Sequence, residues 1–140
     1  MESIDTLQAD LLRIIENYNL HLKRFEEFHG LLEEKDNRVD IFKSTEISEL
    51  KDNGFFIRFL NREYRVSFTL AIGQEFNGCV SCYLAKAFPD TGFRHLESFH
   101  FAANGHADVS DSNNVQSYSI NERRGAYHIL FHCLRISFDT

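Results

Sequence analysis

Apolar side chains recur at alternating steps of three and four along the first 32 residues. The positions are Ile4, Leu7, Leu11, Ile14, Tyr18, Phe25, Phe28 and Leu32, with His21 at the remaining place in the series. This heptad spacing predicts an amphipathic helix of about thirty residues and about 45 Å. A compact domain of this size has a radius of gyration of only about 14 Å. The helix must therefore overhang the domain, break near residues 17–19, or meet a partner.

A period of two replaces the helical spacing in the middle of the chain. Large apolar residues alternate there with polar or small ones, which predicts a strand with one buried face. These apolar residues are Tyr64, Val66, Phe68, Leu70 and Ile72. Residues 54–60 predict its hairpin partner, with a tight turn at Asn61 and Arg62. Further strands are expected over 38–45, 79–88 and 93–102, and a polar surface loop with room for one short strand over 103–119.

A second helix is expected near the end of the sequence. Residues 119–122, Ser-Ile-Asn-Glu, match a capping box, in which the serine and glutamate side chains satisfy free backbone amides. The helix should therefore begin at Ile120. Placed at 100° steps, six of its residues share one arc of about 100°, which we predict as the solvent face. They are Asn121, Arg124, Gly125, His128, His132 and Arg135.

Together these elements predict an α+β fold in a single domain, residues 1–140. An antiparallel β-meander of four to six strands is covered on one face by the long N-terminal helix and the C-terminal helix. Fourteen phenylalanines and no tryptophan indicate a core filled largely by aromatic rings. The expected core residues are Leu11, Ile14, Tyr18, Val66, Phe68, Leu70, Leu84, Phe99, Phe101, Leu130, Cys133 and Leu134.

The charge pattern narrows the classes of partner. The net charge is −6, and the first 36 residues hold nine acidic and four basic side chains. Because no basic stripe with interleaved aromatic residues occurs, nucleic acid is not an expected partner. No stretch approaches 18 apolar residues and the first residues lack a basic segment, so we expect neither a membrane span nor a signal peptide. Three cysteines fit free thiols in the cytoplasm rather than a disulfide framework.

Two pairs of residues have the spacing of metal ligands, but their surroundings argue against a metal. His128 and His132 are four apart on the predicted helix, yet two arginines flank them with positive charge. Cys79 and Cys82 form a Cys-x-x-Cys, yet positions three apart on a strand point to opposite faces. We therefore expect no metal and no cofactor.

A catalytic alternative rests on the histidines near the polar loop. His100, His106 and Asp108 could supply a general base for a small hydrolase or nuclease. The sequence offers no glycine-rich phosphate loop and no recognisable nucleophile motif beside them. A third hypothesis is a small-ligand pocket lined by phenylalanine between sheet and helices.

The long helix supplies the residues of two predicted interaction surfaces. Its acidic residues, expected to face solvent and to dock a basic protein partner, are Glu26, Glu27, Glu33 and Glu34. Its apolar stripe is wider than one sheet face needs, so part of it should stay exposed and form a homodimer interface. The residues that widen the stripe are Leu12, Ile15 and Leu22.

The order of elements supports the interaction hypothesis. A long first helix, a meander containing "SFHFAANGHADVSD" and a closing helix "INERRGAYHILFHCLRI" resemble small α+β proteins of bacterial mobile gene cassettes and toxin-immunity loci. That resemblance implies a protein that acts by binding another protein. We therefore expect a non-catalytic protein-interaction module, such as an immunity or inhibitor protein whose acidic surface blocks a basic partner.

Overall fold

The computed structural model describes residues 3–36, 38–111 and 114–139. Its helices are α1 (Ile4–Glu33), α2 (Asp40–Lys43) and α3 (Arg123–Ile136). Its strands are β1 (Thr45–Ile47), β2 (Gly54–Phe59), β3 (Arg62–Ile72), β4 (Phe76–Ala85), β5 (Phe93–Phe101), β6 (His106–Asp111) and β7 (Asn114–Ser119). The strands pair antiparallel in chain order, β1 to β7, as one meander. The predicted α+β class is confirmed, with seven strands where four to six were expected.

The hairpin between β2 and β3 sets the register of the central strands. Its two turn residues are Leu60 and Asn61, with φ of 51° and 61°, and Phe59 pairs with Arg62 across the turn. Positive φ at both positions matches the right-handed twist of the flanking strands. The turn therefore begins one residue earlier than the predicted Asn61 and Arg62, because Arg62 already belongs to β3.

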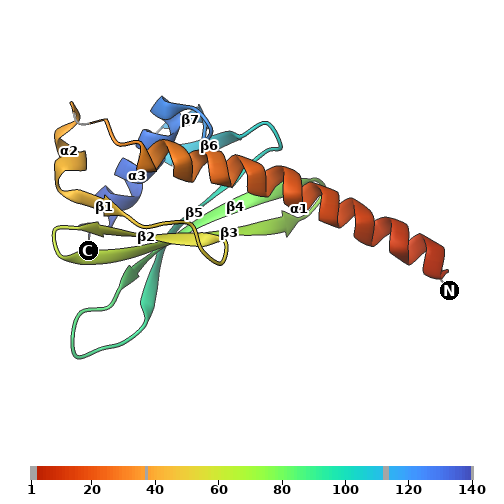
Figure 1. The fold of residues 1–140 in the computed structure, drawn as a ribbon, viewed down its shortest axis with the longest axis horizontal. Helices are drawn as coiled ribbons and strands as arrows, with labels where there is room; N and C mark the ends of the chain where they lie inside the picture. The colour runs from red at the N-terminus through yellow and green to blue at the C-terminus, as the bar shows by residue number, and fades with distance from the viewer. Residues whose placement is uncertain (1–2, 37, 112–113, 140) are drawn as a thin grey trace.

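The core lies between one face of this sheet and the helices α1 and α3 (Figure 1). Phe68 on β3, Val80 on β4 and Phe99 on β5 are in register and buried. Gly78 lets the ring of Phe101 lie against β4, since a Cβ at position 78 would stand 2.1 Å from Phe101 Cζ. Aromatic rings thus fill the layer under the helices, as the phenylalanine content predicted.

Most of the predicted core is buried. The buried members are Val66, Phe68, Leu84, Phe99, Phe101, Leu130, Cys133 and Leu134. Ile14, Tyr18 and Leu70 are only half-buried. Leu11 is 60% exposed, so its assignment to the core is wrong. The reason is that α1 reaches past the sheet at this point.

Helix α1 is unbroken over its 30 residues and overhangs the domain (Figure 1). Its second half packs on the sheet: the Phe25 ring lies 5.6 Å from Phe68 and 5.8 Å from Phe55, between centroids. Its first turn is capped by Ser3, whose hydroxyl accepts a hydrogen bond from the Thr6 amide at 3.2 Å. Of the three predicted outcomes for this helix, the structure shows the overhang and excludes the break.

Two segments differ from their predicted form. The expected edge strand over 38–45 instead contains α2, because Phe42 turns inward to meet the rings of Tyr127 at 4.7 Å and Phe131 at 5.8 Å. The expected surface loop over 103–119 instead forms the β6–β7 hairpin, in which Asp108 pairs with Ser117. Its described polar residues His106, Asp108 and Ser117 are exposed, as outward-facing positions of an outer hairpin are, and in sequence such residues resemble a loop.

Helix α3 begins at Arg123, three residues later than predicted, and Glu122 makes no side-chain cap. Ser119 cannot act as the cap because it still belongs to β7, where it pairs with His106. Its carbonyl accepts the Glu122 amide at 3.2 Å in a turn that leads into the helix. The Ser-Ile-Asn-Glu sequence is therefore a strand-to-helix turn, not a capping box.

Candidate functional site

The first half of α1 carries large apolar side chains that the fold leaves exposed. The exposed fractions are 82% for Ile4, 47% for Leu7, 60% for Leu11, 51% for Leu12 and 53% for Ile15. We call these five residues the α1 apolar face. A contiguous apolar patch on a folded protein commonly marks an interaction surface.

The α1 apolar face begins where the sheet ends. The guanidinium of Arg13 lies 5.4 Å from the centroid of the Phe76 ring, and Phe76 is the first residue of β4, at the β3–β4 turn. On the domain side of this point the Tyr18 ring meets Phe68 at 5.6 Å. Two of the predicted dimer residues, Leu12 and Ile15, are therefore exposed, whereas the third, Leu22, is half-buried against the core.

The second half of α1 holds the residues predicted to dock a basic partner. Glu27 pairs with Arg24 at 2.8 Å, and Glu33 lies 3.2 Å from Nδ1 of the buried His29. Glu26 is exposed and has no ion pair within the described residues. The full set is Glu26, Glu27, Glu33 and Glu34. Much of this predicted acidic surface is thus already engaged within the chain.

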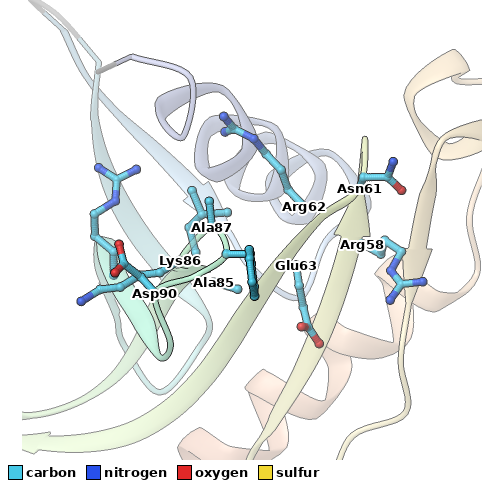
Figure 2. Close-up of a pocket in the computed structure, with 11 residues that line it drawn as sticks. Arg58, Asn61, Arg62, Glu63, Ala85, Lys86, Ala87 and Asp90 are labelled. Carbon is cyan, nitrogen blue, oxygen red and sulfur yellow. The ribbon is translucent and has the colours of Figure 1, made fainter.

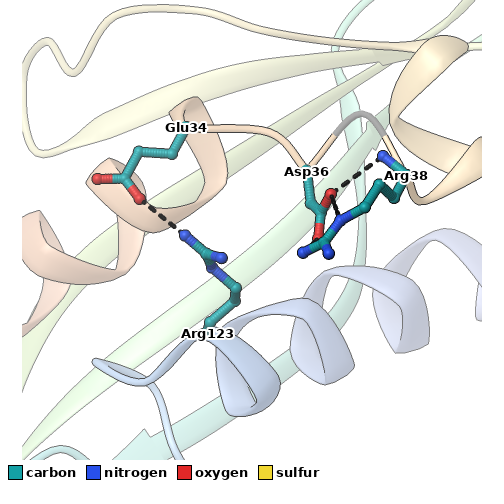
Figure 3. Close-up of polar contacts among 4 residues, drawn as sticks. All are labelled: Glu34, Asp36, Arg38 and Arg123. Carbon is teal, nitrogen blue, oxygen red and sulfur yellow. Dashed lines mark hydrogen bonds and ion pairs between the residues drawn. The ribbon is translucent and has the colours of Figure 1, made fainter.

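The fourth of these residues, Glu34, joins the end of α1 to the start of α3 (Figure 3). Its carboxylate lies 3.3 Å from the Arg123 guanidinium. Nearby, Asp36 accepts hydrogen bonds from the Arg38 side chain at 3.1 Å and from the Arg38 backbone amide at 3.0 Å. These bonds lower the pKa of the Asp36 carboxyl, the side-chain bond first. Both pairs lie at the surface and organise the connection between helices rather than a cleft.

The structure brings together two of the three predicted catalytic residues. His106 Nε2 lies 3.6 Å from the Asp108 carboxylate, and both side chains are more than half exposed. The Ser117 hydroxyl donates to the same Asp108 carboxylate at 2.7 Å. No hydrogen bond or ion pair within the described residues joins His100 to this group. Because Ser117 gives its hydrogen bond to the carboxylate and not to the imidazole, the arrangement is not that of a base-activated nucleophile.

The two histidines of α3 do not lie on the solvent face, so that prediction is wrong. His128 stacks on the Tyr118 ring at 4.0 Å, and His132 meets the Phe99 ring at 5.7 Å and the Glu97 carboxylate at 3.8 Å. The cause is Gly125: a Cβ there would stand 2.1 Å from the Ser119 carbonyl oxygen. The missing side chain lets α3 approach β7 closely, which turns its histidine side toward the sheet.

The cysteines follow the strand prediction in part. Cys79 and Cys82 lie on opposite faces of β4, half-buried and buried. Cys82 meets Cys133 of α3, with 2.7 Å between the sulfur atoms. Burial and then the hydrogen bond with Cys82 raise the pKa of the Cys133 thiol well above its usual range. The thiol therefore stays protonated at neutral pH, the unreactive form of cysteine.

A groove of about 730 Å³ lies where the β2–β3 turn approaches the connection from β4 to β5 (Figure 2). Figure 2 shows Lys86 and Asp90 on one wall, and Asn61, Arg58 and Glu63 on the other. Its basic lining residues are Arg58, Arg62, Lys86 and Arg94. We call this cavity the sheet-end groove.

Sequence reasoning missed the sheet-end groove, although one signal could have found it. In a meander, alternate connections lie at the same end of the sheet, so residues beside the β2–β3 turn and the β4–β5 connection must converge. The four basic residues flank these two connections. No single stretch of the sequence shows this cluster, because Arg58 and Arg94 are far apart in the sequence.

Within the described residues, no group of three histidine, cysteine or acidic side chains is placed to hold a metal ion. Among the described helices, none combines the length and the apolar character that crossing a membrane requires. No protein-family model, curated protein or solved structure matches the chain.

Proposed function

We propose that this protein is a non-catalytic protein-interaction module that pairs with a second copy of itself through the α1 apolar face. The observation that carries the proposal is the exposure of five large apolar side chains on a regular helix outside the sheet's footprint. A two-fold contact buries such a strip against its own copy without requiring any other surface.

The spacing on α1 favours a helix as the occupant of this face. Ile4, Leu7, Leu11, Ile14 and Tyr18 follow the heptad positions that pack helix against helix. The strip from Ile4 to Ile15 is about 17 Å long, or about three turns. Two such strips crossing antiparallel would cover each other along their whole length.

The exposed area is large enough for a reversible dimer. The exposed fractions of the five side chains together equal roughly three fully exposed side chains in each copy. A dimer would therefore bury the equivalent of about six side chains, and at about 2 kcal/mol each their burial would contribute about 12 kcal/mol to association. Association costs about 4 kcal/mol or more. The balance of at most about 8 kcal/mol corresponds to a dissociation constant on the order of micromolar to tens of micromolar.

The proposed biological role is that of an immunity or inhibitor protein that blocks a basic partner. Its acidic residues Glu26, Glu27, Glu33 and Glu34 lie on the second half of α1 and at its C-terminal cap, away from the proposed dimer contact. Glu26 supports this role best, because the other three form contacts within the chain. The three free cysteines support the cytoplasm as its location.

The hydrolase alternative with His100, His106 and Asp108 has weaker support. Asp108 accepts a hydrogen bond from the Ser117 hydroxyl, and within the described residues no hydroxyl group donates a hydrogen bond to His106. The groove beside His106 is a surface depression lined by Ser117, Tyr118 and Glu122 among others. This geometry is why the proposal is non-catalytic.

Light scattering at about 100 µM protein tests the proposal, because this concentration exceeds the expected dissociation constant. We expect about twice the chain mass of 16.3 kDa. Leu12→Glu with Ile15→Glu should give the monomer mass with an unchanged circular dichroism spectrum. Leu20→Glu is the matched control: Leu20 is 41% exposed but lies on the other side of α1, so the dimer should persist.

Two results would contradict the proposal. The first is a monomer mass for the unmodified chain at this concentration. The second is a dimer that survives Leu12→Glu with Ile15→Glu, which would place the contact elsewhere. A partner of different sequence on this face would show as a monomer that pairs only when that partner is added.

A further inference from the structure

The sheet-end groove gathers positive charge on an acidic chain. Four basic residues line it against two acidic ones, Glu63 and Asp90, although the chain carries a net charge of −6. Within the described residues, no carboxylate lies within 4.0 Å of the charged groups of Arg58, Lys86 or Arg94. Cations left without carboxylate partners around a concave surface concentrate a positive potential there. The occupant that matches this field is an anion.

One of the four basic residues is held in place by the fold. Arg62 Nη1 donates to the Ser137 carbonyl oxygen at 2.9 Å, and the guanidinium lies 4.0 Å from the centroid of the Phe138 ring. Figure 2 shows Arg62 turned toward α3, on the side of the strand opposite Glu63. A guanidinium has five N–H donors, so this anchoring leaves donors for a ligand. Arg62 therefore contributes a charge that is already positioned.

The groove also offers an aromatic ring that is almost fully exposed. Phe88, in the connection between β4 and β5, is 97% exposed and lines the groove. Leu84, Ala85 and Ala87 add apolar surface beside it. A flat ring of a ligand can stack on such a side chain while its anionic group meets the basic residues.

The volume limits the size of the occupant. About 730 Å³ falls within the range of about 300–1,000 Å³ that small-molecule sites occupy. We propose that the sheet-end groove binds a small phosphorylated molecule that carries a flat ring, the chemical class of the mononucleotides. Arg62, Lys86 and Arg94 contact the phosphates, since guanidinium and ammonium groups form strong charge-assisted hydrogen bonds with phosphate oxygens. Phe88 stacks on the ring.

The site is separate from the proposed dimer contact. The β2–β3 and β4–β5 connections lie at the opposite end of the sheet from the β3–β4 turn, over which α1 begins to overhang (Figure 1). The proposal therefore stands or falls independently of self-association, and the dimer-breaking variant should bind the ligand as the unmodified chain does.

Titration calorimetry with adenosine diphosphate tests whether the basic residues of the groove bind the phosphates. We expect a dissociation constant on the order of 100 µM for the unmodified chain. Lys86→Glu and Arg94→Glu should each weaken binding by about tenfold or more, because each reverses a charge at the phosphates. Lys23→Glu is the matched control: it makes the same change of charge at an exposed position of α1 and should change the affinity by less than about twofold.

Phe88→Ala tests whether the flat ring of the ligand stacks on Phe88. Because Phe88 is almost fully exposed, its removal should leave the fold intact, which circular dichroism can verify. Affinity for adenosine diphosphate should fall by about fivefold or more, whereas affinity for inorganic pyrophosphate should stay the same. Amide chemical shifts should move in residues 84–94 and 58–63 during the titration.

Four results would overturn the proposal in whole or in part. One is no binding of adenosine diphosphate at about 5 mM, well above the expected constant. Another is an equal loss of affinity with Lys23→Glu, which would indicate attraction by overall charge alone. The third is an affinity that rises steadily with the length of a single-stranded oligonucleotide, which would make the groove part of a nucleic-acid surface. Equal affinity for pyrophosphate and adenosine diphosphate would remove the role of Phe88.

Discussion

The two halves of α1 share one apolar spacing and lie in opposite environments. In the second half, Phe25, Phe28 and Leu32 are at most 1% exposed. In the first half, Ile4 and Leu11 on the same continuing seam are 82% and 60% exposed. Heptad spacing therefore shows that a helix has an apolar face, but it does not show whether the same chain or another one covers that face. In the second half the cover is the sheet of the same chain, and for the first half we propose a second chain.

The boundary between the halves is set by the sheet beneath. The contact of Arg13 with Phe76 marks the β3–β4 turn, beyond which none of the described strands runs under the helix. Just inside this boundary, the Asn53 side-chain amide donates to the Tyr18 hydroxyl. The strand lengths thus decide where intramolecular packing of α1 stops.

The largest expected contrast is between truncations in the two halves. Phe25→Ala removes a ring that is 0% exposed and should lower the free energy of unfolding by about 3–5 kcal/mol. Leu11→Ala removes a mostly exposed side chain and should cost less than about 0.5 kcal/mol. Urea unfolding below about 1 µM protein, where the dimer dissociates, measures both. Similar losses of unfolding free energy for the two variants would contradict the conclusion that only the second half of α1 packs on its own chain.

Two glycine substitutions compare the sheet beneath α1 with the helix itself. Gly78→Ala places a Cβ 2.1 Å from the Phe101 ring, which packs near His21 of α1 at 5.8 Å, and should destabilise the fold by about 1–3 kcal/mol. Gly30→Ala meets no atom within 4 Å and should stabilise α1 by about 0.5–1 kcal/mol. Thermal unfolding should therefore shift in opposite directions. A gain in stability from Gly78→Ala would contradict the tight contact between position 78 and the Phe101 ring.

A pH dependence of stability is expected from the packed part of the molecule. Burial raises the pKa of the Cys133 thiol above its ordinary value of about 8.5. Above that pH the unfolded chain loses this proton while the folded chain keeps it, so stability falls as the pH rises, by up to about 1.4 kcal/mol per pH unit. Unfolding measured from pH 7 to pH 10 should show this fall. Cys133→Ala should flatten the slope, whereas Cys79→Ala should leave it; an unchanged slope in Cys133→Ala would contradict the assignment.

The smallest expected effect concerns the ion pair at the end of the packed half. Glu34 and Arg123 are 63% and 53% exposed and 3.3 Å apart, so solvent screens their attraction. Glu34→Gln should lower stability by no more than about 0.5 kcal/mol, and by less in about 1 M salt. A loss above about 2 kcal/mol would mean that this contact fixes the packing of α1 on α3.

The packed part of the fold could be predicted from the sequence because local patterns match it. The alternation from Tyr64 to Phe68 matches β3, and the heptad seam matches α1. The start of α3 could not be predicted, since Ser119 belongs to β7 and is withdrawn from capping by its pairing with His106. Strand pairing overrode the local signal there.

The surfaces were harder to predict than the core. The exposure of Leu12 and Ile15 follows from the excess length of α1, which the sequence contains. The orientation of His128 and His132 depends on how closely Gly125 approaches Ser119, a tertiary contact without a local signature. The sheet-end groove likewise arises only when two connections of the meander meet, so no local stretch of the sequence shows its cluster of positive charge.

Hydrogen exchange at two protein concentrations is the most direct test of what covers each half of α1. We propose that a second copy covers the first half, whereas the sheet of the same chain covers the second half. Peptides covering residues 4–16 and 21–33 would be compared at about 0.5 µM and about 100 µM protein, below and above the expected dissociation constant. We expect the protection of residues 4–16 to rise with protein concentration, while the protection of residues 21–33 stays high and constant. Equal protection of both segments at the lower concentration, or no gain for residues 4–16 at the higher one, would contradict this proposal.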